Sequence, residues 1–308
     1  MIVARHISKS YRKQRALHDI SFQVPEGSIF GIMGANGAGK STLFEIMTTL
    51  LPNFKGELKI CGMDVRLHKK EIHQVIGYVP GRFSLYEELT TEENLSFFAR
   101  IYGCSVTHIH KNHASLWESL SPFAASQTRY LSGGMKQKLA VCCALVHDPA
   151  ILFLDEPTTG IDPRSRHELW QELSKLRKRG VTILASTHYL SEVNNMDQVL
   201  FLHQGEQLLL DTPQRLLDDY DKELVSVTGL HPYKLFTELK NNAKMHTCYL
   251  SGKSVRIPLD DQIKEDDIRS FCRNARLTSA VVQRVSPGIE DVFIRHLSQI
   301  KQPVTSWK

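Results

Sequence analysis

Residues 131–135 read LSGGM, and this stretch decides, more than any other, which fold the chain adopts. A serine and two glycines at the start of a helix offer backbone N–H groups and the positive end of the helix dipole to an anion. Another phosphate cradle lies upstream, in GANGAGKS at residues 34–41. A chain that owns one cradle has use for a second only if it completes the site of another copy. We therefore expect an assembly of at least two copies.

The upstream loop fits the phosphate-loop pattern G-x-x-x-x-G-K-[ST] at every position. An apolar strand at 28–33 runs into it and a helix is expected at 41–50, which is the required context. Glycines let backbone amides curl around phosphate oxygens. Lys40 supplies charge to the β- and γ-phosphates, and the Ser41 hydroxyl is a ligand for Mg²⁺. The nucleotide-binding residues expected here are Gly34, Asn36, Gly37, Ala38, Gly39, Lys40, Ser41 and Thr42.

Two apolar strands end in residues suited to phosphate chemistry. Asp155 and Glu156 follow the buried strand 151–154, and His188 ends the next buried strand. A carboxylate at the C-terminal edge of a parallel sheet lies beside the ligand crevice. We expect Asp155 to hold Mg²⁺ through water and Glu156 to orient and polarise the attacking water. We expect His188 to bond the γ-phosphate and hold that water in place.

Strands alternate with helices along the first two thirds of the chain, which predicts a mixed, mostly parallel α/β core. Short strands at 2–4 and 20–24 flank a basic turn that contains Tyr11, which is placed to stack on adenine. Residues 88–120 have a helical pattern. The expected domains are a nucleotide-binding domain at 1–214, with a helical subdomain at about 82–145, and an accessory or regulatory domain at 215–308. The latter reads as strand, helix, two strands, helix, strand and a final helix, a ferredoxin-like α+β order.

Composition narrows the class of protein. The chain of 308 residues has 42% hydrophobic and 23% charged residues, which indicates a folded protein with ample core. A net charge of +5 with no long basic run does not indicate nucleic-acid binding. No signal peptide is visible, and no segment approaches the ~20 apolar residues that span a bilayer. The six cysteines lack C-x-x-C spacing, so we expect reduced thiols in a cytoplasmic protein.

Together these motifs resemble the ATP-binding subunit of an ABC transporter over residues 1 to about 212. Tyr11, the phosphate loop, LSGGM, LFLDE at 152–156, Gly160-Ile161-Asp162 and His188 occur in that family's order. The resemblance implies an ATPase that uses ATP and Mg²⁺ in a head-to-tail dimer, with a homodimer expected. It places ATP between Lys40 of one copy and the LSGGM stretch of the other, which is called the signature. The residues that it adds to the site are Ser132, Gly133, Gly134 and Asp162.

Three further stretches resemble the drug- and antibiotic-exporter branch of that family. They are LYEELT at 85–90, STHYL at 186–190 and PGIEDVF at 287–293. The resemblance implies an efflux system in which this chain, peripheral at the cytoplasmic face of the inner membrane, energises a membrane permease. A periplasmic adaptor is a further expected partner. The permease is expected to dock at Arg82–Tyr102, with Phe83, Leu85, Tyr86 and Phe97 as candidate groove residues.

One position departs from the family pattern, which has glutamine after Tyr78-Val79-Pro80. This chain has Gly81 there, so we expect either slower or differently coupled hydrolysis or a tolerated substitution. The alternative functions are a soluble ABC ATPase acting on ribosomes or DNA, and a weakly hydrolysing regulatory cassette. The run His108, His110 and His113 is a weaker candidate for a metal site.

Overall fold

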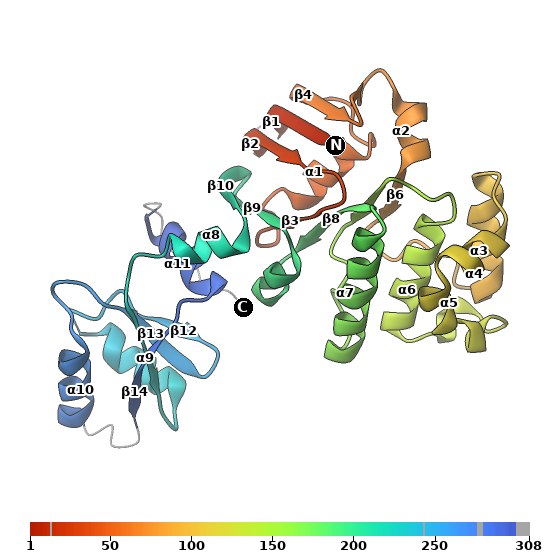
Figure 1. Cartoon of the computed structure of the whole chain (residues 1–308). Helices are drawn as coiled ribbons and strands as arrows, with labels where there is room; N and C mark the ends of the chain where they lie inside the picture. Colours follow the sequence, from red (N-terminus) through yellow and green to blue (C-terminus); the bar gives the residue numbers. More distant parts are fainter. Residues whose placement is uncertain (13, 243, 276–279, 300–308) are drawn as a thin grey trace. The chain divides into compact units, whose positions relative to one another are not determined.

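The computed structural model describes residues 1–12, 14–242, 244–275 and 280–299. It divides into two compact units, Met1–Pro213 and Gln214–Lys308, beside the boundary expected after residue 214. Figure 1 shows that each unit has its own sheet. The two units are therefore described separately.

The first unit is built on a ten-stranded mixed sheet of order β5-β4-β1-β2-β10-β9-β3-β8-β7-β6. Strands β9, β3, β8, β7 and β6 run parallel to one another, whereas β10 pairs antiparallel with β9, and β1 pairs antiparallel with β2 and β4. The strands are β1 (Ile2–Tyr11), β2 (Gln14–Val24), β3 (Ile29–Met33), β4 (Lys55–Ile60), β5 (Met63–Asp64), β6 (Ile76–Val79), β7 (Ile151–Leu154), β8 (Thr182–Thr187), β9 (Gln198–His203) and β10 (Glu206–Asp211). Every residue of β3, β7 and β8 is buried, as in parallel strands covered on both faces.

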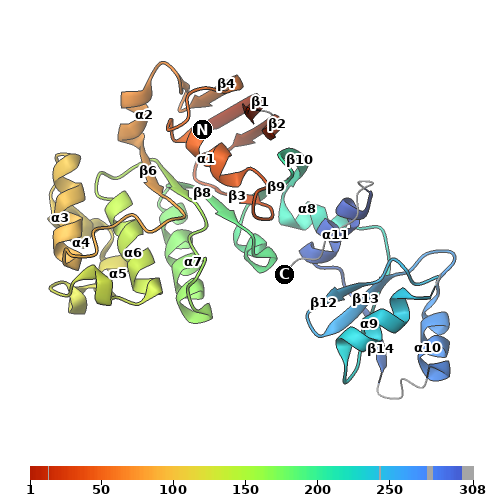
Figure 2. The same cartoon turned by 180° about the vertical axis from the view of Figure 1, so that it is seen from behind.

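Helices cover this sheet and also form a group of their own. The helices are α1 (Lys40–Met47), α2 (Lys69–Val75), α3 (Thr91–Ile101), α4 (Val106–Asn112), α5 (Ala114–Glu118), α6 (Gly133–Ala144) and α7 (Pro163–Lys178), with 3₁₀ turns η1 (Ser121–Phe123), η2 (Thr128–Tyr130) and η3 (Leu190–Asn195). Figures 1 and 2 show α3 to α6 gathered together, away from β1, β2 and β4. This group falls within the helical subdomain expected at about 82–145.

The first two strands are longer than the sequence predicts. Strands were expected at 2–4 and 20–24, but β1 and β2 continue toward each other until Tyr11 pairs with Gln14. Register shifts between Ala4 and Ser10 let the hairpin bend. Arg5, Arg15 and Asp19 are exposed on it, and such polar side chains hid the strand pattern. The prediction that Tyr11 lies in a turn was therefore wrong, because Tyr11 is the last residue of β1. Residue 13 of the predicted basic turn lies outside the described residues.

The helical pattern expected over 88–120 is broken into three helices. Thr90 caps α3, because its hydroxyl accepts from the Glu93 N–H at 3.2 Å and the Glu93 carboxylate accepts from the Thr90 N–H at 2.8 Å. Gly103 then adopts a left-handed φ of 68° just after the end of α3. These two signals set the bounds of the helix more sharply than hydrophobic periodicity does.

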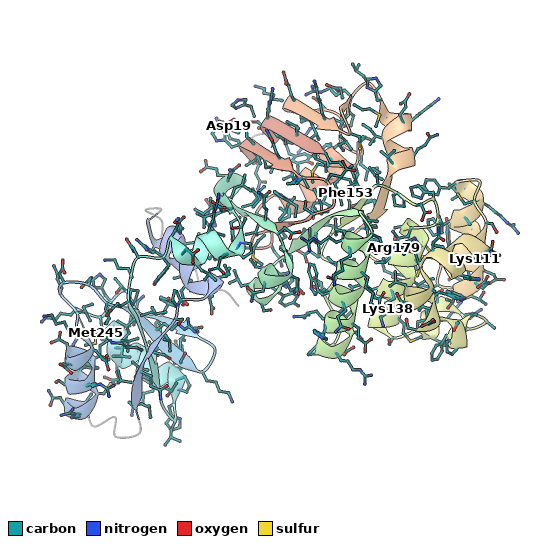
Figure 3. The ribbon with its side chains drawn as sticks, in the orientation of Figure 1. Asp19, Lys111, Lys138, Phe153, Arg179 and Met245 are labelled. Atoms are coloured by element: carbon teal, nitrogen blue, oxygen red, sulfur yellow. The ribbon has the colours of Figure 1, made fainter. Side chains whose placement is uncertain are left out.

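The core of the first unit lies where α1 packs on the sheet. The rings of Phe44 and Phe153 meet edge to face with centroids 5.9 Å apart, and neither is exposed. Figure 3 shows Phe153 inside this unit and Asp19 at its edge. This packing fixes α1, and so the loop before it, against the strand ends that carry Asp155 and Glu156.

The second unit has a four-stranded antiparallel sheet of order β12-β13-β11-β14. Its elements are α8 (Pro213–Asp218), which begins at the boundary, β11 (Leu224–Thr228), α9 (Pro232–Lys240), β12 (Tyr249–Ser251), β13 (Ser254–Pro258), α10 (Glu265–Asn274), β14 (Val281–Val285) and α11 (Ile289–Gln299). Met245 belongs to its apolar core, as Figure 3 shows. Residue 279, the expected start of the last strand, lies outside the described residues.

A buried acid anchors α11 within this unit. Asp291 is fully buried and accepts from the Tyr249 hydroxyl at 2.7 Å and the Gly288 N–H at 2.6 Å. It also pairs with Arg256 of β13.

Among the described residues of the whole chain, no helix is both long and apolar enough to cross a membrane.

Candidate functional site

The loop between β3 and α1 is a tight glycine turn. Gly37 and Gly39 have left-handed φ values of 81° and 105°. A Cβ on Gly39 would lie 2.6 Å from the carbonyl oxygen of Ala16, and one on Gly34 would lie 2.5 Å from that of Leu202. Side chains at these two positions would therefore displace the neighbouring backbone. Such a turn at the start of a helix is suited to holding an anion by backbone N–H groups.

The other loop residues predicted to bind nucleotide are arranged around this turn. Asn36 is exposed at its tip, Ala38 is buried beneath it, and Ser41 and Thr42 lie in the first turn of α1. Lys40 begins α1 and is only 4% exposed.

The Lys40 ammonium group lies at the centre of the site. Its Nζ donates to the carbonyl oxygens of Gly34 at 2.8 Å and Ala35 at 3.2 Å. It also lies 3.0 Å from Oε1 of Glu156. The buried cation is thus satisfied by loop carbonyls and one carboxylate. Phosphate oxygens are hydrogen-bond acceptors of the same kind, so the Lys40 ammonium group is placed to bind them.

Two adjacent acids follow β7, and one serine side chain orients both. The Ser186 hydroxyl accepts from the Glu156 N–H at 2.8 Å and donates to the carboxylate of Asp155, which is 5% exposed. Glu156 itself has φ of 50°, a left-handed conformation that is uncommon for a residue with a side chain. The backbone there turns so that the two carboxylates are held separately.

Glu156 connects the charged loop to the histidine after β8. Its Oε2 accepts from the Thr159 hydroxyl at 3.0 Å and lies 3.4 Å from Nδ1 of His188. Burial raises the pKa of the Glu156 carboxyl. The hydrogen bond and charge of Lys40, together with Thr159 and His188, outweigh burial and hold this pKa below its ordinary value. The residue is therefore ionised near neutral pH, as a group that orients or activates water must be.

Oxygen donors near Asp155 suit a hard cation. Asp155 Oδ1 is bonded to Ser186, whereas a Cβ built on Gly81 would lie 3.6 Å from Oδ2 and 3.1 Å from the Asp155 carbonyl oxygen. Mg²⁺ prefers such oxygens together with phosphates and waters. No group of three or more His, Cys, Asp or Glu side chains suited to a metal occurs among the described residues. The side chain of His108, in the suggested histidine run, lies outside them.

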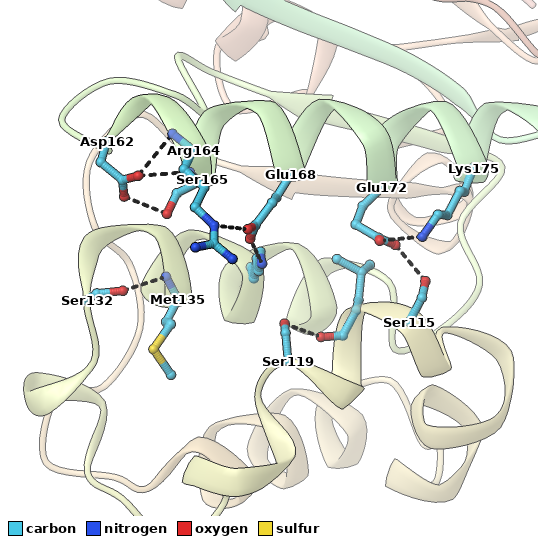
Figure 4. Close-up of polar contacts among 12 residues, drawn as sticks. Ser115, Ser119, Ser132, Met135, Asp162, Arg164, Ser165, Glu168, Glu172 and Lys175 are labelled. Carbon is cyan, nitrogen blue, oxygen red and sulfur yellow. Dashed lines mark hydrogen bonds and ion pairs between the residues drawn. The ribbon is translucent and has the colours of Figure 1, made fainter.

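The signature residues form a second capped turn at the start of a helix, elsewhere in the unit. The Ser132 hydroxyl caps α6 by accepting from the Met135 N–H at 3.3 Å, and Asp162 caps α7 by accepting from the N–H groups of Arg164 and Ser165 (Figure 4). Ser132, Gly133 and Asp162 are exposed. Figure 1 places α6 with α3 to α5, whereas α1 lies beside β1 and β2.

The two capped helices are locked together at their starts. A Cβ on Gly134 would lie 2.3 Å from the Ser165 Oγ, so only glycine allows α6 to approach α7 this closely. Lys138 of α6 also bonds Glu168 of α7 at 2.8 Å. These contacts hold together one surface, here called the signature surface, on which Ser132, Gly133 and Asp162 are exposed and Gly134 is buried.

Tyr11 lies at the end of β1. Its side chain is 45% exposed, and Lys9 Nζ lies 5.2 Å from the ring centroid. Sequence reasoning missed Thr159, Ser186 and Thr187, which hold the acids and His188. Hydroxyl residues are common at strand ends and in turns, so only their places beside Glu156 and His188 could have indicated them.

Comparisons with known proteins indicate the same family as the sequence motifs do. The sequence profile described as ABC transporter matches residues 17–159. The linearmycin resistance ATP-binding protein LnrL of Bacillus subtilis is 35% identical over 305 residues, covering 96% of this chain and 97% of its own. The Nod factor export ATP-binding protein I of Sinorhizobium fredii is 32% identical over 306 residues, covering 94% and 84%. The probable multidrug ABC transporter ATP-binding protein YbhF of Escherichia coli is 37% identical over 218 residues, and the match spans 70% of this chain but only 38% of YbhF.

Solved structures show the same fold. The ATP-binding subunit of an ABC transporter superposes with a TM-score of 0.65 at 30% identity, covering 71% of this chain and 93% of that one. The dimeric structure of MJ0796, a bacterial ABC transporter cassette, gives a TM-score of 0.62 at 27% identity, covering 69% and 98%.

The Lys40 contact generates a prediction about acid titration. Without Lys40, burial dominates, so Lys40→Met should raise the pKa of Glu156 above its wild-type value. In the wild type, the ion pair stabilises the folded chain above the ordinary carboxyl pKa, and this contribution disappears as pH falls through the lowered pKa. Carboxyl NMR titration of carbon-13 glutamate-labelled protein would measure the shift.

Lys136→Met is the matched control, because Lys136 pairs with Glu87 at 3.1 Å outside the site. It should leave the Glu156 titration unchanged. An equal Glu156 pKa in wild type and Lys40→Met would contradict the assigned contact.

Proposed function

Because this chain belongs to the ABC transporter family, we propose that it is the ATP-binding and ATP-hydrolysing subunit of an exporter. The observation that carries the proposal is the convergence of Lys40, Glu156 and His188 within 3.4 Å contacts. A buried cation, an ionised carboxylate and an imidazole at one sheet edge are the groups needed to bind a triphosphate and direct water at its γ-phosphate.

The glycine turn and Lys40 bind the phosphates in this proposal. The phosphates replace the Gly34 and Ala35 carbonyl oxygens and the Glu156 carboxylate as partners of Lys40, which frees that carboxylate to accept a proton from water. Tyr11 stacks on adenine, and His188 contacts the γ-phosphate. Ser41 and Asp155 hold Mg²⁺, which supplies charge neutralisation on the phosphates when bound.

A second copy completes the site. Ser132 and Gly133 are exposed at the start of a helix, so they are free to face a phosphate that belongs to another chain. We assign Ser132, Gly133, Gly134 and Asp162 to a head-to-tail homodimer interface. The signature residues then contact the nucleotide of one copy while Lys40 holds that of the other.

The permease docks beside the helical subdomain in this proposal. A groove of about 240 Å³ is lined by both core and helical residues, among them Leu50, Tyr78, Leu85 and Phe98. Next to it in sequence, Tyr86 and Phe97 are partly exposed, with ring centroids 4.8 Å apart. Aromatic groups around an apolar groove suit an amphipathic helix. The chain would thus lie peripherally at the cytoplasmic face of the inner membrane.

The names of the relatives favour export over action on ribosomes or DNA, because they describe multidrug, linearmycin and Nod factor systems. They do not support the expected periplasmic adaptor, and it is not proposed. The transported compound is chosen by the permease, so this chain does not specify it.

Hydrolysis is tested by Glu156→Gln. The amide keeps the size of the side chain but cannot accept a proton, so phosphate release should fall roughly 100-fold or more while ATP still binds. Size-exclusion chromatography with ATP should then show the trapped dimer. Glu88→Gln, whose side chain is 74% exposed, is the control. Equal phosphate release by wild type and Glu156→Gln would refute the enzymatic proposal.

Docking is tested with membrane vesicles from cells that express the chain with or without its permease. The chain should sediment only with permease-containing vesicles, and Tyr86→Ala should weaken this binding about tenfold. Phe123→Ala should bind normally, because Phe123 is also exposed, at 43%, but unlike Tyr86 is not adjacent in sequence to a residue that lines the groove. Nuclease-sensitive sedimentation with ribosomes instead would support the alternative function.

Gly81 provides a test specific to this chain. Gly81→Gln would place an amide beside the Asp155 carboxylate, and we expect it to raise ATPase activity or its stimulation by the permease. Gly81→Ala is the matched control, because it adds the same Cβ, 3.1 Å from the Asp155 carbonyl oxygen, without the amide. If neither rate nor stimulation differs between the two variants, Gly81 is a neutral substitution.

A further inference from the structure

A buried carboxylate lies behind His188 and has no role in the chemistry described so far. Glu192, in η3, is only 2% exposed. Its Oε2 accepts from the Thr187 hydroxyl at 2.6 Å, whereas its Oε1 has no hydrogen bond among the described residues. Burying a carboxylate costs free energy unless it is paired with a cation, so the partner of Glu192 indicates what this residue does.

That partner is Arg166, in the second turn of α7. Arg166 Nε lies 3.6 Å from Glu192 Oε1, close enough for charge pairing but beyond a hydrogen bond. The Arg166 guanidinium also lies over the ring of Tyr189, 3.9 Å from its centroid. One side chain of α7 thus contacts both the buried acid and the residue after His188.

These contacts hold His188 from both sides. The Thr187 hydroxyl donates to Glu192 and accepts from the Tyr189 N–H at 3.0 Å, and the rings of His188 and Tyr189 lie 4.1 Å apart. The backbone that carries His188 is therefore fixed by Glu192 and Arg166 through its two neighbours.

Arg166 is also connected to the signature surface, which comprises Ser132–Gly134 and Asp162. The backbone N–H of Arg166 donates to the Asp162 carbonyl oxygen at 3.0 Å. The adjacent Ser165 packs on Gly134, and its hydroxyl donates to the Asp162 carboxylate at 2.6 Å (Figure 4). A displacement of Ser132–Gly134 or of Asp162 would therefore move Arg166 as well.

From this geometry we infer that Arg166 and Glu192 are positioning residues that couple the signature surface of a subunit to its own His188. Resting on the proposed function, the coupling works as follows. When Ser132 and Asp162 engage a second copy, the first turns of α7 shift and the loose Arg166–Glu192 contact closes to a hydrogen bond. Closure seats Tyr189 and Thr187, which aims His188 at the γ-phosphate. Each subunit thereby links the nucleotide that it touches in its partner to the one that it holds.

The test is a double-mutant cycle on the full chain with ATP as substrate. Arg166→Gln should lower kcat roughly tenfold while KM changes less than about twofold, because it disturbs orientation rather than binding. In a His188→Ala background the same substitution should have no further effect, since it acts through His188. Arg177→Gln is the matched control: Arg177 also projects from α7 to an acid after β8, Asp197, but its ion pair does not contact the histidine segment. It should leave kcat unchanged.

An equal loss of kcat from Arg166→Gln in both backgrounds, or an equal loss from Arg177→Gln, would overturn the inference. If His188→Ala has no measurable rate, Glu192→Gln decides. It keeps an acceptor for Thr187 and removes only the charge, so a kcat matching Arg166→Gln supports the coupling and a wild-type kcat overturns it. A wild-type chain that releases no phosphate contradicts the proposed function itself. An active wild type together with any of the overturning results contradicts the coupling alone.

Discussion

The contact between the Lys40 ammonium and the Glu156 carboxylate, 3.0 Å apart, is the interaction around which the first unit is organised. Lys40 begins the helix after β3, and Glu156 follows β7, with β8 between the two strands. Only parallel strands place these C-terminal ends on one edge. The core pair Phe44 and Phe153 then sets the separation of α1 from β7, so the packing of apolar rings determines the distance between two charges.

Several residues of the site serve the fold and the proposed chemistry at once. Ser132 and Asp162 are helix caps, Ser186 orders the acids of β7, and Gly134 lets α6 lie against α7. A substitution at any of these positions changes helix geometry together with the site. The fold and the proposed chemistry therefore depend on the same residues.

The sequence predicts the local motifs well and their contacts poorly. GANGAGKS and LFLDE identify the loop and the acids because each has a fixed spacing to a strand or helix. The length of β1, the break after α3 and the left-handed turn at Glu156 depend on pairing and caps that hydrophobic periodicity does not report. The Arg166–Glu192 pair is 26 residues apart in sequence number and belongs to no motif. Long-range polar pairs of this kind become visible only when α7 is packed on β8.

The left-handed backbone of Glu156 sets stability and function against each other. At φ of 50° a glycine or asparagine would relieve a conformational cost on the order of 1 kcal/mol, and either would remove the ionised carboxylate. Selection for a more stable chain alone would therefore drift away from glutamate at this position. A form of this protein selected for stability alone is therefore expected to lose the carboxylate proposed to direct water, unless residue 156 is held constant while the rest of the sequence is varied.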